Sequence, residues 1–161
     1  GPGCAVQNAA AGRARAVCGG VAMDVRWAVL SPRVTAGPLM GALRRLVARA
    51  EAEDLQEHWL EGADGRPSTW RVMSSQEPAY VTAVSVWVEG KAVRPGLAMR
   101  KRMALDSLFG ASVPPVVVAV TPVADWAGTG GAGVKAQETG LASFLRGGVD
   151  WDRVVRVLAG G

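Results

Sequence analysis

The stretch VPPVVVAV at residues 113–120 decides the fold class. Its last five residues, Val116 to Val120, form a continuous apolar run of strand length. β-Branched residues favour strands, and a strand that is apolar on both faces lies between two packed layers. We therefore predict a buried central strand over residues 116–120.

The first strand and the first helix are predicted upstream of this run. Between Met23 and Val29, apolar and polar residues alternate, which is typical of a half-buried strand. Thr35 then offers an oxygen that caps a helix N-terminus. Apolar residues recur at helical spacing as far as Leu60, so we predict a long helix that ends at Gly62.

A hairpin and a second helix follow. Residues 69–73 and 80–88 are β-prone and are separated by turn-forming residues, so we predict that they pair antiparallel. A helix is predicted from Pro95 to Gly110. With residues 116–120 the order is βαββαβ, which predicts an α+β ferredoxin-like sandwich: a four-stranded antiparallel sheet with two helices on one face.

Two short helices are predicted after the sandwich, over residues 134–145 and 150–158, the second capped by Asp150. We expect them to cover an edge or the open face of the sheet. Residues 23–161 are thus predicted to form one α+β domain, in keeping with a length of 161 residues.

The first 22 residues are predicted to lie outside this domain. Gly1-Pro2 resembles the remnant of a cleaved tag, and residues 3–22 are small and weakly patterned, so we expect an irregular arm. Cys4 and Cys18 lie within the arm and are the only cysteines. They form a disulfide if the compartment is oxidising and stay free thiols otherwise. Both alternatives remain open here.

The composition indicates what kind of protein this is, but it says little about its activity. The abundance of Arg, Val and Ala and the absence of Ile indicate a GC-rich bacterial genome. No segment is apolar for long enough to span a bilayer. A net charge of +4 allows an anionic partner such as nucleic acid, and its densest run is Arg100-Lys101-Arg102. We favour a solvated helix face for this run and keep it as a candidate binding site.

One triplet resembles a catalytic motif. Glu89-Gly90-Lys91 at a strand end is similar to the acidic-X-Lys triplet of the PD-(D/E)XK metal nucleases, in which carboxylates hold Mg²⁺ and a lysine assists the attacking water. That pattern also needs an upstream aspartate, and Asp64 is the one candidate. We favour a polar strand end and name no catalytic residue.

Other chemistry finds little support. The glycine-rich stretch 128–135 lacks the spacing of a phosphate-binding loop, and we predict a flexible loop. His58 is the single histidine, and with two cysteines it cannot complete a Cys/His zinc site. We expect the C-terminal dipole of the long helix to stabilise His58. No metal, cofactor or small-molecule ligand is predicted.

Six tryptophans are the most unusual feature of the composition. Trp87 falls on the strand face opposite Val84, Val86 and Val88, and this face would be open in the predicted sandwich. Either the C-terminal helices cover it through Trp151 or Phe144, which we favour, or it stacks on a base or binds a protein partner.

These observations favour a non-catalytic protein-interaction or assembly domain of a larger bacterial complex, free or membrane-associated. It would bind a protein partner or a second copy of itself through its sheet or an edge strand. The alternative is a basic nucleic-acid-binding domain, with the metal nuclease as its catalytic variant. Location in the cytoplasm or on the outer face of a membrane is left open, as is enzymatic activity.

Overall fold

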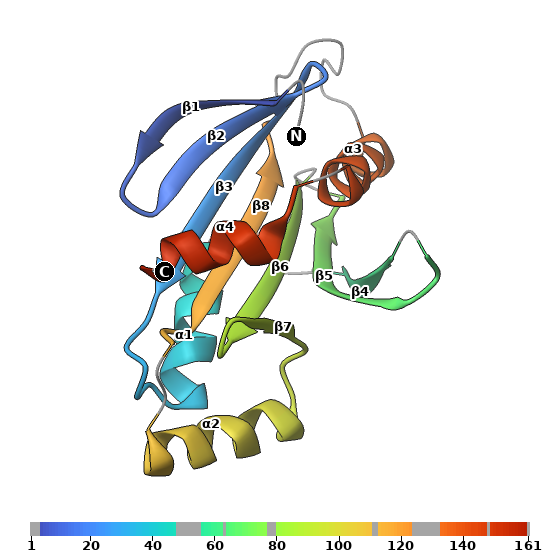
Figure 1. Ribbon diagram of the computed structural model, residues 1–161. Helices are drawn as coiled ribbons and strands as arrows, with labels where there is room; N and C mark the ends of the chain where they lie inside the picture. Colours follow the sequence, from blue (N-terminus) through green and yellow to red (C-terminus); the bar gives the residue numbers. More distant parts are fainter. Residues whose placement is uncertain are drawn as a thin grey trace.

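The computed structural model describes residues 4–47, 56–62, 64–76, 80–110, 113–123, 133–147 and 149–160 (Figure 1). The strands are β1 (Cys4–Ala10), β2 (Arg13–Cys18), β3 (Val21–Val29), β4 (Gln56–Glu61), β5 (Pro67–Ser75), β6 (Tyr80–Val88), β7 (Lys91–Val93) and β8 (Val116–Pro122). The helices are α1 (Ala36–Val47), α2 (Leu97–Phe109), α3 (Val134–Arg146) and α4 (Trp151–Leu158).

All eight strands belong to one antiparallel sheet. Its order is β1-β2-β3-β8-β6-β5-β4, and the short β7 pairs with β6. The chain therefore runs through β1, β2 and β3 in sequence, then through β4, β5 and β6, and β8 closes the sheet by entering between β3 and β6.

The α+β class is confirmed, but the ferredoxin-like topology is wrong. The predicted sandwich has four strands, whereas this sheet has eight in a largely sequential order. The two C-terminal helices do cover the second face of the sheet, as expected. The difference in strand number arises because three segments that were not predicted as strands add the other four. Residues 4–18 and 56–61 form β1, β2 and β4 at the two edges of the sheet, and residues 91–93 form the short β7 beside β6.

Strand β8 is a buried central strand, as its sequence predicts. It pairs with β3 on one side and with β6 on the other, and Val116, Val117, Val118 and Val120 are fully buried. Because successive side chains point to opposite faces, β8 contributes to two cores. Val117 packs in the core under α1 and α2, and Val118 packs in the core under α3 and α4.

The N-terminal segment forms strands, so the prediction of an irregular arm is wrong. β1 and β2 pair with each other, and β2 pairs with β3 over six residue pairs. Gly12 closes the first hairpin, and Gly19 and Gly20 close the second, all three with positive φ. Two consecutive residues with positive φ suit the tight turns that match the twist of a hairpin. The glycines at the turns therefore allow these hairpins to form, although the side chains of residues 4–18 show little apolar alternation.

The first helix is shorter than predicted. It ends at Val47, and β4 pairs with β5, so the predicted helix as far as Leu60 is wrong. Leu60 is buried in the sheet core, and that packing overrides the helical preference of the charged stretch before it. Gly62, predicted to end the helix, lies in the β4–β5 turn, where a Cβ would come within 2.7 Å of the Arg66 carbonyl oxygen.

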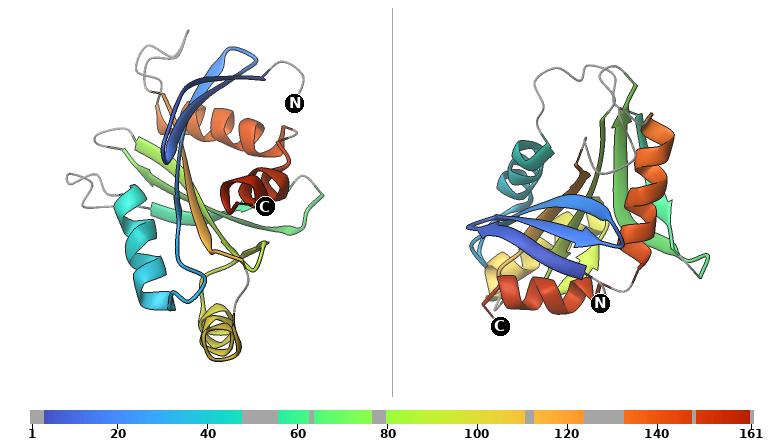
Figure 2. Two further views of the ribbon diagram at one scale, coloured as in Figure 1. Left: turned by 60° about the vertical axis from the view of Figure 1, so that its left-hand side comes forward. Right: turned by 90° about the horizontal axis from the view of Figure 1, so that it is seen from above.

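The remaining helices agree with the sequence. α2 ends at Gly110 as predicted, and the Asp150 carboxylate caps α4 by accepting a hydrogen bond from the Arg153 N–H. α3 and α4 lie across the sheet face opposite α1 (Figure 2). No helix in the described ranges is both long and apolar enough to cross a membrane.

Candidate interaction edge

The residues of the nuclease-like triplet form a turn. Glu89 and Gly90 both have positive φ, at 52° and 74°, and they connect Val88 of β6 to Lys91 of β7, which pair directly. Asp64 lies in a different hairpin, where it forms an ion pair with Arg66 at 3.3 Å. Among the described residues, no three His, Cys, Asp or Glu side chains come close enough to hold a metal ion. The structure therefore lends the triplet no catalytic geometry.

Two other sequence candidates, His58 and Lys135, line one open hollow of about 690 Å³ between β4 and α3, but no described hydrogen bond joins them. His58 is exposed on β4, so the helix dipole invoked for it is absent and that prediction is wrong. Of the glycine-rich stretch 128–135, residues 128–132 lie outside the described residues. Lys135 is exposed on α3.

Trp87 is buried, with 2 % of its surface exposed. Its indole Nε1 donates a hydrogen bond to Asp152 Oδ1 at 2.8 Å, and its ring meets Trp70 edge to face at 5.7 Å. Trp70 also contacts Trp151, which in turn contacts Phe144. The C-terminal helices thus cover this face, so the Trp87 ring cannot stack on a base here.

Helices cover both faces of the described sheet, and β7 is only three residues long, so β1 and β4 are the two edge strands long enough to pair with a further strand. The β4 edge carries several features that hinder another strand. Glu57 forms an ion pair with Arg71 at 3.6 Å, and a bulge interrupts the strand between Trp59 and Glu61. The Arg146 guanidinium donates to the Glu61 carbonyl oxygen at 2.9 Å. Charges, bulges and covered carbonyls are the usual protection of an edge strand.

The β1 edge lacks charged protection. Every residue of β1 is exposed, and its sequence, CAVQNAA, contains no charge. Val6 is 70 % exposed. A bulge between Gln7 and Ala10 limits the regular ladder to Cys4–Gln7. Those four residues form a short, uncharged edge that is exposed within the part of the chain that the structure describes.

A disulfide holds this edge in place. Cys4 and Cys18 are direct partners across β1 and β2, and their sulfurs are bonded. Their Cα atoms lie 4.2 Å apart, which is the spacing of a pair that exchanges no backbone hydrogen bonds. The backbone groups of Cys4 therefore point away from β2, and by alternation so do those of Val6. Both residues offer an N–H and a C=O along the outer edge.

No family model, curated protein or solved structure matches this chain.

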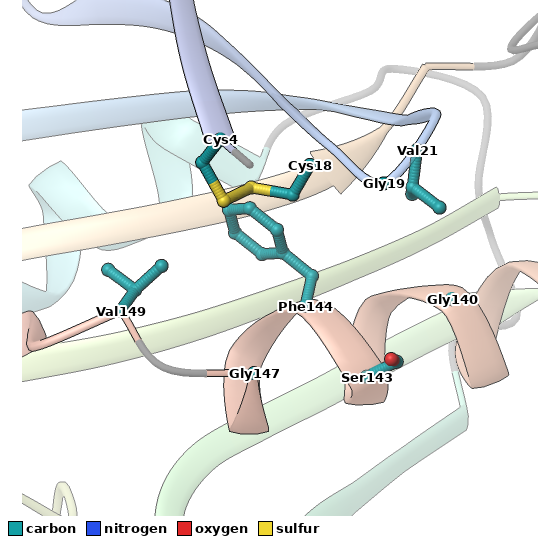
Figure 3. A pocket seen from close by; sticks show the side chains of 9 residues that line it. All are labelled: Cys4, Cys18, Gly19, Val21, Gly140, Ser143, Phe144, Gly147 and Val149. Atoms are coloured by element: carbon teal, nitrogen blue, oxygen red, sulfur yellow. A yellow bond between two sulfur atoms is a disulfide. The ribbon is translucent and has the colours of Figure 1, made fainter. Parts of the chain in front are cut away.

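A hollow of about 320 Å³ lies beside the disulfide (Figure 3). Its lining combines the disulfide with apolar side chains and small residues of α3 and the α3–α4 connection. The Phe144 ring points toward the sulfurs, and Val21 and Val149 flank it. Glycines and Ser143 complete the wall. The β1 edge therefore adjoins a small, largely apolar hollow.

Sequence reasoning did not identify β1 as part of a site. The Ala and Gly content hid the strand, although Gly19-Gly20 between two short runs is a hairpin signal. The two cysteines were the one candidate site feature that lies at this edge. Arg100, Lys101 and Arg102 are exposed on α2, and Figure 1 places that helix at the other end of the molecule from β1.

Proposed function

We propose that this chain is a non-catalytic protein-interaction domain of a larger assembly, and that it binds a strand of another polypeptide along β1. The observation that carries the proposal is the contrast between the two edges. β4 is charged, bulged and capped by Arg146, whereas Cys4–Gln7 is uncharged and exposed. Unprotected edges readily pair with a further strand.

The geometry of β1 suits strand addition. The outward N–H and C=O groups of Cys4 and Val6 supply main-chain hydrogen bonds, which give such complexes much of their affinity. The disulfide holds β1 on β2 before binding, so less conformational entropy is lost when a partner strand docks. An apolar side chain of the partner can enter the hollow next to Phe144.

Site-specific photocrosslinking in cells tests the proposal. A photoreactive amino acid replaces Gln7 on β1 in one variant and Gln56 on β4 in the other. Both residues are exposed glutamines on edge strands. The two variants therefore differ chiefly in which edge, β1 or β4, carries the photoreactive group. We expect a discrete crosslinked protein band from position 7 and none, or a much weaker one, from position 56.

The identity of the band separates a second copy of the chain from a different protein. Equal crosslinking from both positions, or none from position 7, contradicts strand addition at β1. Binding to generic DNA or RNA that weakens steeply with salt, together with no protein crosslink, would support the nucleic-acid alternative instead.

A further inference from the structure

Helix α2 exposes an unusual amount of apolar surface. It buries only Met99 and Met103 against the rest of the protein. Four large apolar side chains face solvent, with exposed fractions of 70 % for Leu97, 55 % for Leu105, 77 % for Leu108 and 83 % for Phe109. Half of the exposed large apolar side chains in the described ranges therefore lie on this one helix. Figures 1 and 2 show α2 as the outermost layer at one end of the molecule.

The exposed residues gather on the outer side of the helix. Successive helical residues are about 100° apart, which places Leu97, Leu105 and Leu108 within one arc and Phe109 next to it. Arg100 and Arg102 fall on the two borders of that arc. All of these side chains are exposed, whereas Met99 and Met103 on the inner side are buried. The outer side is thus an apolar ridge flanked by arginines.

The ridge also carries uncompensated positive charge. Arg100, Lys101 and Arg102 are exposed, and no described hydrogen bond or ion pair joins their side chains to another residue of the described ranges. Asp106 is the only acidic residue of α2, and it is half-buried on the inner side. Lys101 falls within the apolar arc, where a long aliphatic stem can lie along apolar surface while its ammonium group extends outward.

We propose that α2 docks this domain onto an anionic membrane surface. Leu105, Leu108 and Phe109 enter the boundary between headgroups and acyl chains, while Arg100 and Arg102 contact lipid phosphates on either side. A bilayer offers both environments at different depths along one flat surface, which fits an exposed convex ridge. An acidic protein would neutralise the cations but needs a complementary apolar groove to cover the leucines as well.

This membrane contact does not depend on the proposed function. β1 and α2 lie at opposite ends of the molecule in Figure 1, so docking through α2 leaves the β1 edge free for a partner chain. Either contact can fail without the other. The two together would place a protein-binding edge at a membrane surface.

Vesicle sedimentation with the full chain tests the docking surface. The vesicles contain phosphatidylcholine alone or phosphatidylcholine with about one third phosphatidylserine. We expect binding to the anionic vesicles only. Replacing Arg100, Lys101 and Arg102 together by Gln should weaken that binding about 100-fold, since each basic residue near an anionic surface contributes about fivefold. Replacing Leu108 and Phe109 by Ser should weaken it at least tenfold.

A charge-matched control replaces Arg13, Arg153 and Arg156 by Gln, because all three are exposed and lie on β2 and α4 rather than on α2 or on α1, which packs against it. It should bind like the parent chain. An environment-sensitive dye on Leu108→Cys should brighten on the vesicles, and the same dye on Ser107→Cys, about 100° around the helix, should change much less.

Three outcomes overturn the assignment. The first is equal binding to both kinds of vesicle, and the second is an equal loss in the control that lacks the other three arginines. The third is no vesicle binding by a chain that is retained on an acidic peptide column through Arg100 to Arg102, which would assign α2 to an acidic protein. Circular dichroism and thermal unfolding confirm that each variant is folded.

Discussion

The hydrogen bond from Trp87 to Asp152 joins the sheet to the last helix, and its removal should be measurable. Trp87 lies on β6 with 2 % exposure, and its indole Nε1 is 2.8 Å from Asp152 Oδ1 in the first turn of α4. The indole is buried and has no other described acceptor. Deleting Asp152 therefore leaves a buried donor without a partner.

The expected magnitudes follow from this geometry. Asp152→Ala should lower the free energy of unfolding by about 1–3 kcal/mol, because an unsatisfied buried donor keeps its desolvation cost. Trp87→Phe should cost about 2–4 kcal/mol, since it loses the hydrogen bond and also leaves space beside Trp70. The double variant should cost about 1–2 kcal/mol less than the sum of the two, because the bond can be lost only once.

Urea unfolding of the four proteins, followed by tryptophan fluorescence and circular dichroism, gives this coupling free energy. Asp152→Asn serves as a control that keeps an oxygen acceptor and should recover part of the loss. Losses that add to within about 0.5 kcal/mol would refute the bond and with it the docking of α4 on Trp87.

Three further outcomes are expected. Val117→Asp should unfold the domain, because a charge at a residue with no exposed surface costs several kcal/mol out of a total stability of roughly 5–15 kcal/mol; a thermal transition within a few degrees of the parent would contradict the central-strand assignment. Gly90→Ala should cost about 1 kcal/mol in thermal unfolding, because φ is 74° and a Cβ there meets no atom within 4 Å, so only backbone strain is added. Replacing Cys4 and Cys18 by Ser should speed amide hydrogen exchange of Ala5 and Gln7, whose N–H groups face β2, roughly 100-fold, because a disulfide that closes a loop of this length contributes about 3 kcal/mol.

Much of the interior could be predicted from residue patterns. The uninterrupted valines of β8, the alternation in β3 and the Gly110 limit of α2 each reflect one local rule, and the structure agrees with them. Helix α2 begins at Leu97, two residues after the predicted start at Pro95. Trp87 could be assigned to a face by alternation alone. Its cover, formed by Trp70, Trp151 and Phe144, depends on residues far apart in the chain.

The edges could not be predicted in the same way. Residues 56–61 include Gln, Glu and Leu, which favour helices in isolation, and only pairing with β5 makes them a strand. β1 buries none of its side chains, so no periodic apolar pattern marks it. The proposed site consists of backbone N–H and C=O groups of such an edge. Because every residue type has these groups, the sequence of side chains does not reveal the site.

Strand addition at β1 is the central claim, and one substitution tests it most directly. Val6→Pro removes an outward N–H and places a proline ring where a partner strand would lie, while the ladder to β2 loses no hydrogen bond. Val6→Ala is the matched control, because it shortens the side chain and keeps the backbone donor. Both are introduced into the chain that carries the photoreactive residue at Gln7.

The measurement is the yield of the crosslinked partner relative to the chain with Val6 intact. We predict that Val6→Pro lowers the yield about tenfold or more, while Val6→Ala changes it by less than about threefold. Unchanged circular dichroism shows that the hairpin persists in both. A Val6→Pro chain that is folded and captures its partner as well as the parent chain does would contradict binding along β1.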